Sequence, residues 1–466
     1  MELDLYTGTL TYKDIEFSFS FVNEELRLIP PKDKHHEVEH WFMKEIATGT
    51  YTFGEPVYIE DNSLIGKCNE TGQTMVFLPK RRSVGRYNSV LIVEIEAYIL
   101  QKFDREFIDR LSFSGDEIDC IFPTTQALKP QKWSENGCFS VETKDFEGTT
   151  TQKQTFAVDG KNISVYFGIS RTSNVKIGKP PLELHSVMFF EFDKISDYSF
   201  ILRLWRIAKS FIQYLCYRKN VNLSKVDIAS PYKDGKHEPF ATLYVTGENC
   251  NNEPEILNKH RYIQQSNING REGNILSDIA SDKIYLRHLP QSYKNGRHID
   301  AARFVMITAA LEWTFNKNYP EGITKKSATI KAEETAATSL QELIDNSKGK
   351  LKNIYKFLKK LIGTDSLQTK IEQIGKDYSE IIDVFGNRLY SLNHEMLKYS
   401  EMGNRLSEQR NNYAHGNLDK DFIGLSLLDL MYAEQVIYAM QLKEYGLENI
   451  EIQRGINALF GCSLQF

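Results

Sequence analysis

The residue types best suited to chemistry lie close together in one segment near the C-terminal end of the chain, residues 408–417. Arg410, Asn411 and His415 fall within two turns of a predicted helix, and Gly416 is suited to the left-handed position that ends it. Positions four apart share a helix face, so the asparagine and the histidine point the same way, while the arginine lies about 140° round the helix. The long arginine side chain can still bring its guanidinium to the same place.

These three groups suit the cleavage of a phosphodiester without a metal ion. A guanidinium offers a fork of donors to a phosphate, and an imidazole gives or takes a proton near neutral pH. We therefore expect Arg410 to hold the phosphate, His415 to move protons and Asn411 to orient one of them. The spacing of arginine and histidine alone is common by chance, and the alternative is a histidine at a helix end with an exposed arginine nearby.

An apolar helix predicted over residues 298–316 supplies a candidate partner for this segment. Its apolar residues lie on all sides, which indicates a helix buried within a bundle. Glu312 lies inside this apolar run, where an uncompensated carboxylate would cost several kcal/mol. We expect Glu312 to pair with Arg410, and the alternatives are a purely structural ion pair or a position at the rim of the bundle.

A second helix, predicted over residues 348–362, has an apolar stripe on one side and a stripe of five lysines on the other. An aligned row of lysines can neutralise successive phosphates. The candidate RNA contacts, called the lysine row below, are Lys352, Lys356 and Lys360. The alternative is a face that only keeps the protein soluble.

The segment around Arg410 reads Arg-Asn-x-x-Ala-His-Gly and is predicted to lie on a helix between two long amphipathic helices. In this it resembles the HEPN family of helical ribonucleases, whose signature is an arginine, a polar residue, a few more residues and a histidine. With a long β-rich half in front, the whole chain resembles the ApeA-type HEPN anti-phage defence proteins. HEPN proteins often carry an acidic residue on an early helix that faces the motif, and Glu312 matches that position.

The resemblance implies a metal-independent endoribonuclease that leaves a 2′,3′-cyclic phosphate. HEPN nucleases usually pair two motifs across a dimer, so one motif per chain implies a homodimer with a composite cleft. It also implies anti-phage defence by abortive infection, with host RNA such as tRNA as substrate and a phage-derived trigger. The alternative is a non-catalytic HEPN module for dimerisation or RNA binding, with the N-terminal region as the functional part.

The pattern of apolar residues predicts an α+β protein of two main parts. Residues 1–295 are expected to be β-rich, with strands over 5–12, 15–22 and 26–29 and a possible subdomain break near residue 196. The resemblance implies that this region is a sensor or regulator. Residues 298–466 are expected to be all-α, and the resemblance implies that they form a HEPN-type helical bundle that holds the nuclease motif.

Composition limits the other classes of function. The formal net charge of −5 over 466 residues argues against a protein that coats nucleic acid non-specifically. The cysteines form no CxxC pair, and His35, His36 and His40 lack a third ligand of suitable spacing, so we expect no metal and no cofactor. No apolar run reaches transmembrane length and no leader pattern is evident, so we expect a soluble, cytoplasmic protein without membrane association.

Overall fold

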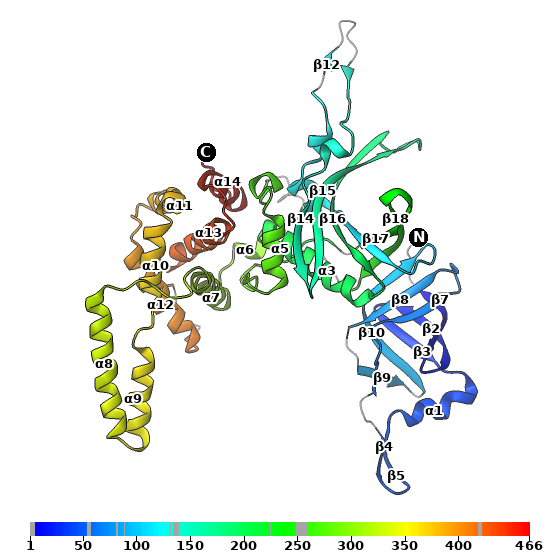
Figure 1. Cartoon of the computed structure of the whole chain (residues 1–466), viewed down its shortest axis with the longest axis horizontal. Coiled ribbons are helices and arrows are strands. Elements are labelled where there is room, and N and C mark those ends of the chain that lie inside the picture. Colours follow the sequence, from blue (N-terminus) through cyan, green and yellow to red (C-terminus); the bar gives the residue numbers. More distant parts are fainter. Residues whose placement is uncertain are drawn as a thin grey trace. The chain divides into compact units, whose positions relative to one another are not determined.

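The structure is a computed structural model that describes residues 5–466 except 54–56, 81–82, 88, 131, 134–138, 224, 248–252, 254–258 and 418–421. The chain divides into two compact units, Met1–Ser281 and Asp282–Phe466. The first unit is rich in β-strands and the second is helical (Figure 1), so the fold class is α+β. The sequence placed the boundary between the two parts at residues 295–298, which is about 15 residues later than in the structure.

The first unit begins with a closed β-barrel of six strands. The strands are hydrogen-bonded in the order β10-β3-β2-β1-β7-β8, and β8 pairs back with β10. Buried and exposed residues alternate along β1, β2 and β7, so every second side chain enters the barrel. The strands predicted over 5–12, 15–22 and 26–29 are confirmed. The six strands are β1 (Tyr6–Tyr12), β2 (Ile15–Val22), β3 (Glu25–Ile29), β7 (Leu64–Cys68), β8 (Thr74–Pro79) and β10 (Val90–Gln101).

Aromatic rings fill the barrel. Phe19 and Phe21 each pack on Phe77 with ring centroids 5.2 Å apart. The Phe19 ring lies against Gly8, where an added Cβ would be 2.0 Å from the carbonyl oxygen of Lys67 and 2.6 Å from the ring. Glycine therefore lets β1 and β7 meet beside a large aromatic side chain.

The barrel strand β10 also borders a second run of antiparallel strands, in the order β14-β15-β16-β11-β17-β18-β10. Strands from both sides of residue 196 lie in this one sheet. The helix α5 (Glu272–Ala280) packs on β14 and on α3 (Tyr198–Cys216). The strands are β11 (Ile108–Phe113), β14 (Gln154–Val158), β15 (Lys161–Ser173), β16 (Leu182–Ile195), β17 (Lys225–Pro231) and β18 (His237–Val245).

Shorter elements complete the first unit. They are α1 (His35–His40), β4 (Met43–Ala47), β5 (Thr50–Phe53), β6 (Val57–Tyr58), β9 (Ser83–Tyr87), α2 (Asp116–Ile121), β12 (Lys132–Trp133) and β13 (Phe139–Ser140).

The second unit is built around α13 (Ser426–Glu444). Every residue from 432 to 442 is buried, because α7, α11, α12 and α14 surround this helix. The other helices are α6 (Tyr293–Gly296), α7 (Ala301–Asn318), α8 (Ser327–Asp345), α9 (Gly349–Leu361), α10 (Leu367–Asp377), α11 (Ser379–Ser391), α12 (Tyr399–Ala414) and α14 (Asn449–Phe460). Among the described residues, no helix is both long and apolar enough to cross a membrane.

Helix α7 corresponds to the helix predicted over residues 298–316, but it is not buried on all sides. Phe304, Leu311 and Phe315 are buried, whereas Met306 is 39% and Trp313 48% exposed. The expectation of complete burial was wrong because this side of α7 is covered only in part, by the segment before it. The Trp313 indole donates a hydrogen bond to the backbone oxygen of residue 283 at 3.0 Å.

Helices α8 and α9 form an antiparallel hairpin that extends away from the other helices of the unit (Figure 1). Its base is held by Lys325, whose Nζ is 2.7 Å from a Glu333 oxygen and 2.9 Å from the Gly363 carbonyl oxygen. The Asp365 carboxylate also accepts a hydrogen bond from the backbone N–H of Ile323 at 3.0 Å. These contacts fix the two chain segments from which the hairpin starts and to which it returns.

Candidate active site

The C-terminal end of α12 carries the predicted motif and is anchored to the bundle by its buried side. Gln409 is fully buried, and its Oε1 accepts a hydrogen bond from the backbone N–H of Ile423 at 2.7 Å. Tyr413, one turn later, packs edge-on against Phe304 of α7 at 5.6 Å and against Phe422 at 6.1 Å. The motif residues next to these anchors therefore start from a fixed backbone.

The helix ends where the sequence predicted, at a glycine in the left-handed conformation. Gly416 has φ +85°, and its N–H donates to the Tyr413 carbonyl oxygen at 3.1 Å. The N–H of Asn417 donates to the carbonyl oxygen of Asn412 at 3.0 Å. These bonds satisfy carbonyl groups at the end of the helix and place His415 at its C-cap, directly after Ala414.

Arg410 and Glu312 form the ion pair expected from the sequence, between α12 and α7. The two side chains are each 27% exposed, so the pair lies at the surface of the bundle and not in its core. A second cation also approaches the carboxylate, because Lys370 Nζ of α10 is 3.6 Å from Glu312 Oε1. One carboxylate between two cations leaves a surplus of positive charge at this place, which favours an anion such as a phosphate.

Lys370 is a site residue that the sequence did not reveal. It sits on α10, which packs on α12, and its Nζ also donates to Asn316 Oδ1 at 3.1 Å. A single lysine on a helix of mixed charge has no distinguishing pattern. Only the packing of α10 against α12 and α7 identifies it as a neighbour of the motif.

His415 and Asn411 lie on the surface at the end of α12. Among the described residues, no hydrogen bond or ion pair joins either side chain to Arg410 or Glu312. The structure thus brings Arg410, Glu312 and Lys370 into contact and leaves the other two predicted residues open to solvent beside them. Residues 418–421, which follow directly, lie outside the described residues.

The lysine row lies on the α8–α9 hairpin. Lys356 and Lys360 are exposed and Lys352 is half-buried. The neighbouring Lys359 is turned towards α8, where its Nζ donates to Gln341 Oε1 at 2.7 Å. Two of the three lysines are therefore free to meet a polyanion, and the third borders the contact between the two helices.

A buried network holds α12 in place and was not foreseen from the sequence. Arg405 donates from Nε and Nη2 to the two carboxylate oxygens of Asp429, at 2.7 and 2.8 Å, and Asp429 is fully buried. The hydroxyl of Tyr390 on α11 donates to the same carboxylate. Burial next to this carboxylate raises the pKa of Tyr390, and the Asp429 hydrogen bonds raise that of Arg405. Three helices are thereby joined through one aspartate.

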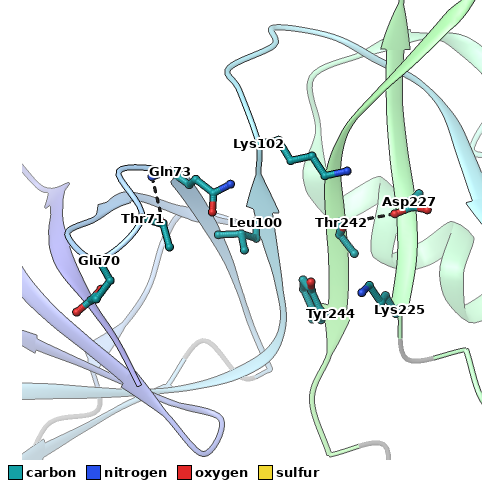
Figure 2. A pocket seen from close by; sticks show the side chains of 9 residues that line it. All are labelled: Glu70, Thr71, Gln73, Leu100, Lys102, Lys225, Asp227, Thr242 and Tyr244. Atoms are coloured by element: carbon teal, nitrogen blue, oxygen red, sulfur yellow. Dashed lines mark hydrogen bonds between the residues drawn. The ribbon is translucent and has the colours of Figure 1, made fainter. Parts of the chain in front are cut away.

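The first unit contains a separate cleft of about 640 Å³, shown in Figure 2. It lies between the loop that carries Glu70 and Gln73 and the strands β17 and β18. Lys225 Nζ lies 5.4 Å from the centre of the Tyr244 ring, and Thr242 donates to Asp227 at 3.2 Å. Its lining is Glu70, Thr71, Gln73, Leu100, Lys102, Lys225, Asp227, Thr242 and Tyr244. A mixed lining of this kind suits a polar ligand of small size.

In the part of the chain that the structure describes, no group of three or more His, Cys, Asp or Glu side chains is placed to hold a metal ion. Compared with known proteins, the chain matches no family model, no curated protein and no solved structure. The chemistry of the site therefore has to be argued from its own residues.

Proposed function

We propose that this protein is a metal-independent endoribonuclease, with Arg410 and His415 as the catalytic pair at the end of α12. The observation that supports the proposal most is the Arg410–Glu312 ion pair, with Lys370 beside it. A guanidinium held at the surface by a carboxylate, with a second cation next to it, is arranged to receive a phosphate. An exposed histidine at the C-cap of the same helix adds the proton-transfer group.

The proposed reaction is transfer of the phosphate within the RNA chain. The ribose 2′-oxygen loses its proton to a base and bonds to phosphorus, while the 5′-oxygen of the next nucleotide leaves and takes up a proton. Arg410 stabilises the negative charge on the phosphate oxygens, and His415 carries the protons. Asn411, on the same helix face as His415, orients the imidazole. Glu312 acts through Arg410 by holding its guanidinium, so its role is positioning.

Two copies of the site would meet in a homodimer, so that one imidazole accepts a proton and the other donates one. Resemblance to ApeA-type HEPN proteins supports the biological setting. The protein would cleave host RNA such as tRNA in anti-phage defence, after a phage-derived trigger acts on the N-terminal unit. The lysine row would bind the RNA backbone.

The proposal is tested with purified wild type, Arg410→Ala and His415→Ala, each incubated with total tRNA in EDTA. We expect cleavage by the wild type alone. Because the resting protein can be inactive, growth on overexpression in cells is measured for the same three forms, and we expect toxicity from the wild type only. Cleavage or toxicity that survives in both variants would place the active site elsewhere.

The second candidate function is a non-catalytic helical module with the N-terminal unit as the working part. The cleft of Figure 2 favours this candidate, because its two lysines and two carboxylates, Lys102, Lys225, Glu70 and Asp227, can hold a polar ligand. An absence of both cleavage and toxicity in the wild type would support it. Ligand-induced stabilisation that is lost on Lys225→Glu would then identify the cleft as the site.

A further inference from the structure

The α8–α9 hairpin exposes a continuous apolar surface. No residue of α9 is buried, although the helix is amphipathic. Six large apolar side chains of the hairpin, in chain order, are exposed by 43, 49, 53, 61, 41 and 50%. They are Leu343, Leu351, Ile354, Phe357, Leu358 and Leu361, together called the hairpin face. Monomeric proteins rarely leave so many large apolar side chains together in water.

The side chains of the hairpin face lie on one side of the hairpin, as the helical repeat shows. On α8, the side turned towards α9 includes Ala337 and the buried Ile344. Stepping about 100° per residue places Ala332, Ala336 and Leu343 a quarter-turn to one side of that contact. The two helices run in opposite directions, so the apolar stripe of α9 comes out on the same side. The lysine row comes out on the opposite side.

The area of the hairpin face is large enough for an interface between proteins. From the exposed fractions, its six side chains present about 600 Å² to solvent, which is the upper end for a single patch on a monomer. Two such faces packed together would remove about 1,200 Å², which reaches the range of specific protein–protein interfaces. The alanines Ala332 and Ala336 would let the helices approach closely.

We propose that the hairpin face is the surface through which two copies of this chain associate, forming a four-helix bundle from two hairpins. The area of the hairpin face favours a second copy as the occupant, because two such faces together reach the size of a specific interface. A two-fold axis along the hairpin sets each α8 beside the partner's α9, so that the two apolar faces meet. The helical repeat turns the α8 carboxylates Glu334, Glu342 and Asp345 away from the hairpin face, as it does the lysine row of α9, so these charged groups stay in water.

The hairpin interface deepens the proposed function. The interface itself is argued from the hairpin alone, and only its biological role rests on the proposed nuclease function. The same two-fold axis places both helical bundles at one end of the four-helix bundle. Two Arg410–His415 pairs are then on the same side of the dimer, as a shared cleft requires. The lysine row stays exposed on the outside of each hairpin, where RNA can reach it.

The test compares Ile354→Glu and Phe357→Glu with Thr338→Glu, which introduces the same charge on the opposite side of the hairpin. Mass is measured by sedimentation equilibrium of the full chain at micromolar concentrations. We expect a dimer for the wild type and for Thr338→Glu, and a monomer for the other two variants. Because all three positions are exposed, melting followed by circular dichroism should stay the same and shows that the variants fold.

A monomeric wild type, or variants at the hairpin face that remain dimeric, would overturn the inference. So would a monomeric wild type that binds vesicles of anionic phospholipid through this face, because the occupant would then be a membrane. A dimer that cleaves no RNA would leave the inference standing and remove the proposed function. Cleavage by the monomeric variants would leave the hairpin interface standing and show that the nuclease does not need a cleft shared between two copies.

Discussion

Helix α12 carries two arginines, five positions apart in the sequence. Replacing one of them with alanine should affect stability, and replacing the other should affect catalysis. Arg405 forms a two-point ion pair with the fully buried Asp429 and is 18% exposed. Arg410 pairs with Glu312 at the surface of the bundle, where Lys370 is a second cation close to the Glu312 carboxylate. We expect Arg405→Ala to destabilise the fold and Arg410→Ala to abolish catalysis with little effect on the fold.

The magnitudes follow from burial. Removing Arg405 leaves a buried carboxylate without its cation, which costs about 3 to 5 kcal/mol of the free energy of unfolding. Removing Arg410 leaves Glu312 with 27% exposure and with Lys370 Nζ at 3.6 Å, so the cost should be about 1 kcal/mol or less. For catalysis, losing a group that stabilises charge in the transition state costs about a hundredfold or more in rate.

The assay combines urea unfolding of the full chain, followed by the loss of helical circular dichroism, with cleavage of total tRNA. Arg410→Lys is the matched variant, because it keeps the charge and loses the fork of donors. Equal destabilisation by Arg405→Ala and Arg410→Ala would show that both arginines are structural. Full activity in Arg410→Ala would refute the role of this guanidinium.

Further predictions concern the helix end, the lysine row and the alkaline limit of stability. His415→Ala should abolish cleavage and change the free energy of unfolding by less than about 0.5 kcal/mol, because the side chain is exposed; a large loss of stability would indicate a structural histidine. Gly416→Ala meets no atom within 4 Å but keeps φ +85°, so it should cost about 1 kcal/mol in urea unfolding, and no cost would show that the helix end relaxes. Changing all three residues of the lysine row to glutamate should weaken RNA binding and lower the slope of log affinity against log salt by about 2 to 3, whereas an unchanged slope would leave the row as solubilising surface. Burial raises the pKa of Tyr390, so its contribution to stability is complete below the ordinary tyrosine pKa of about 10 and is lost as pH rises through the higher folded value. Tyr390→Phe should therefore flatten the alkaline fall of the unfolding free energy, and an unchanged pH profile would contradict this assignment.

The local elements were predictable from the sequence because their periodicity is strong. The first three strands alternate buried and exposed residues, and the predicted helix over 348–362 appears as α9. The closure of the barrel was not predictable, since the pairing of β8 with β10 depends on contacts between distant segments. The apolar stripe of α9 was visible in the sequence, but its exposure was not.

The candidate site was predictable only where a local feature of the sequence pointed to it. A carboxylate in an apolar helix needs a cation, and that requirement alone pointed from Glu312 to Arg410. Lys370 and Asp429 were missed because each is an ordinary charged residue on an ordinary helix. Their importance comes from α10 and α13 packing on α12, which no local pattern reveals.

The most direct test of the central claim is the chemistry of the RNA ends left by the wild type in EDTA. Cleavage by a guanidinium and an imidazole through the 2′-oxygen should leave a 2′,3′-cyclic phosphate on one fragment and a free 5′-hydroxyl on the other. Fragments that carry a 3′-hydroxyl and a 5′-phosphate, or cleavage that EDTA abolishes, would contradict the mechanism.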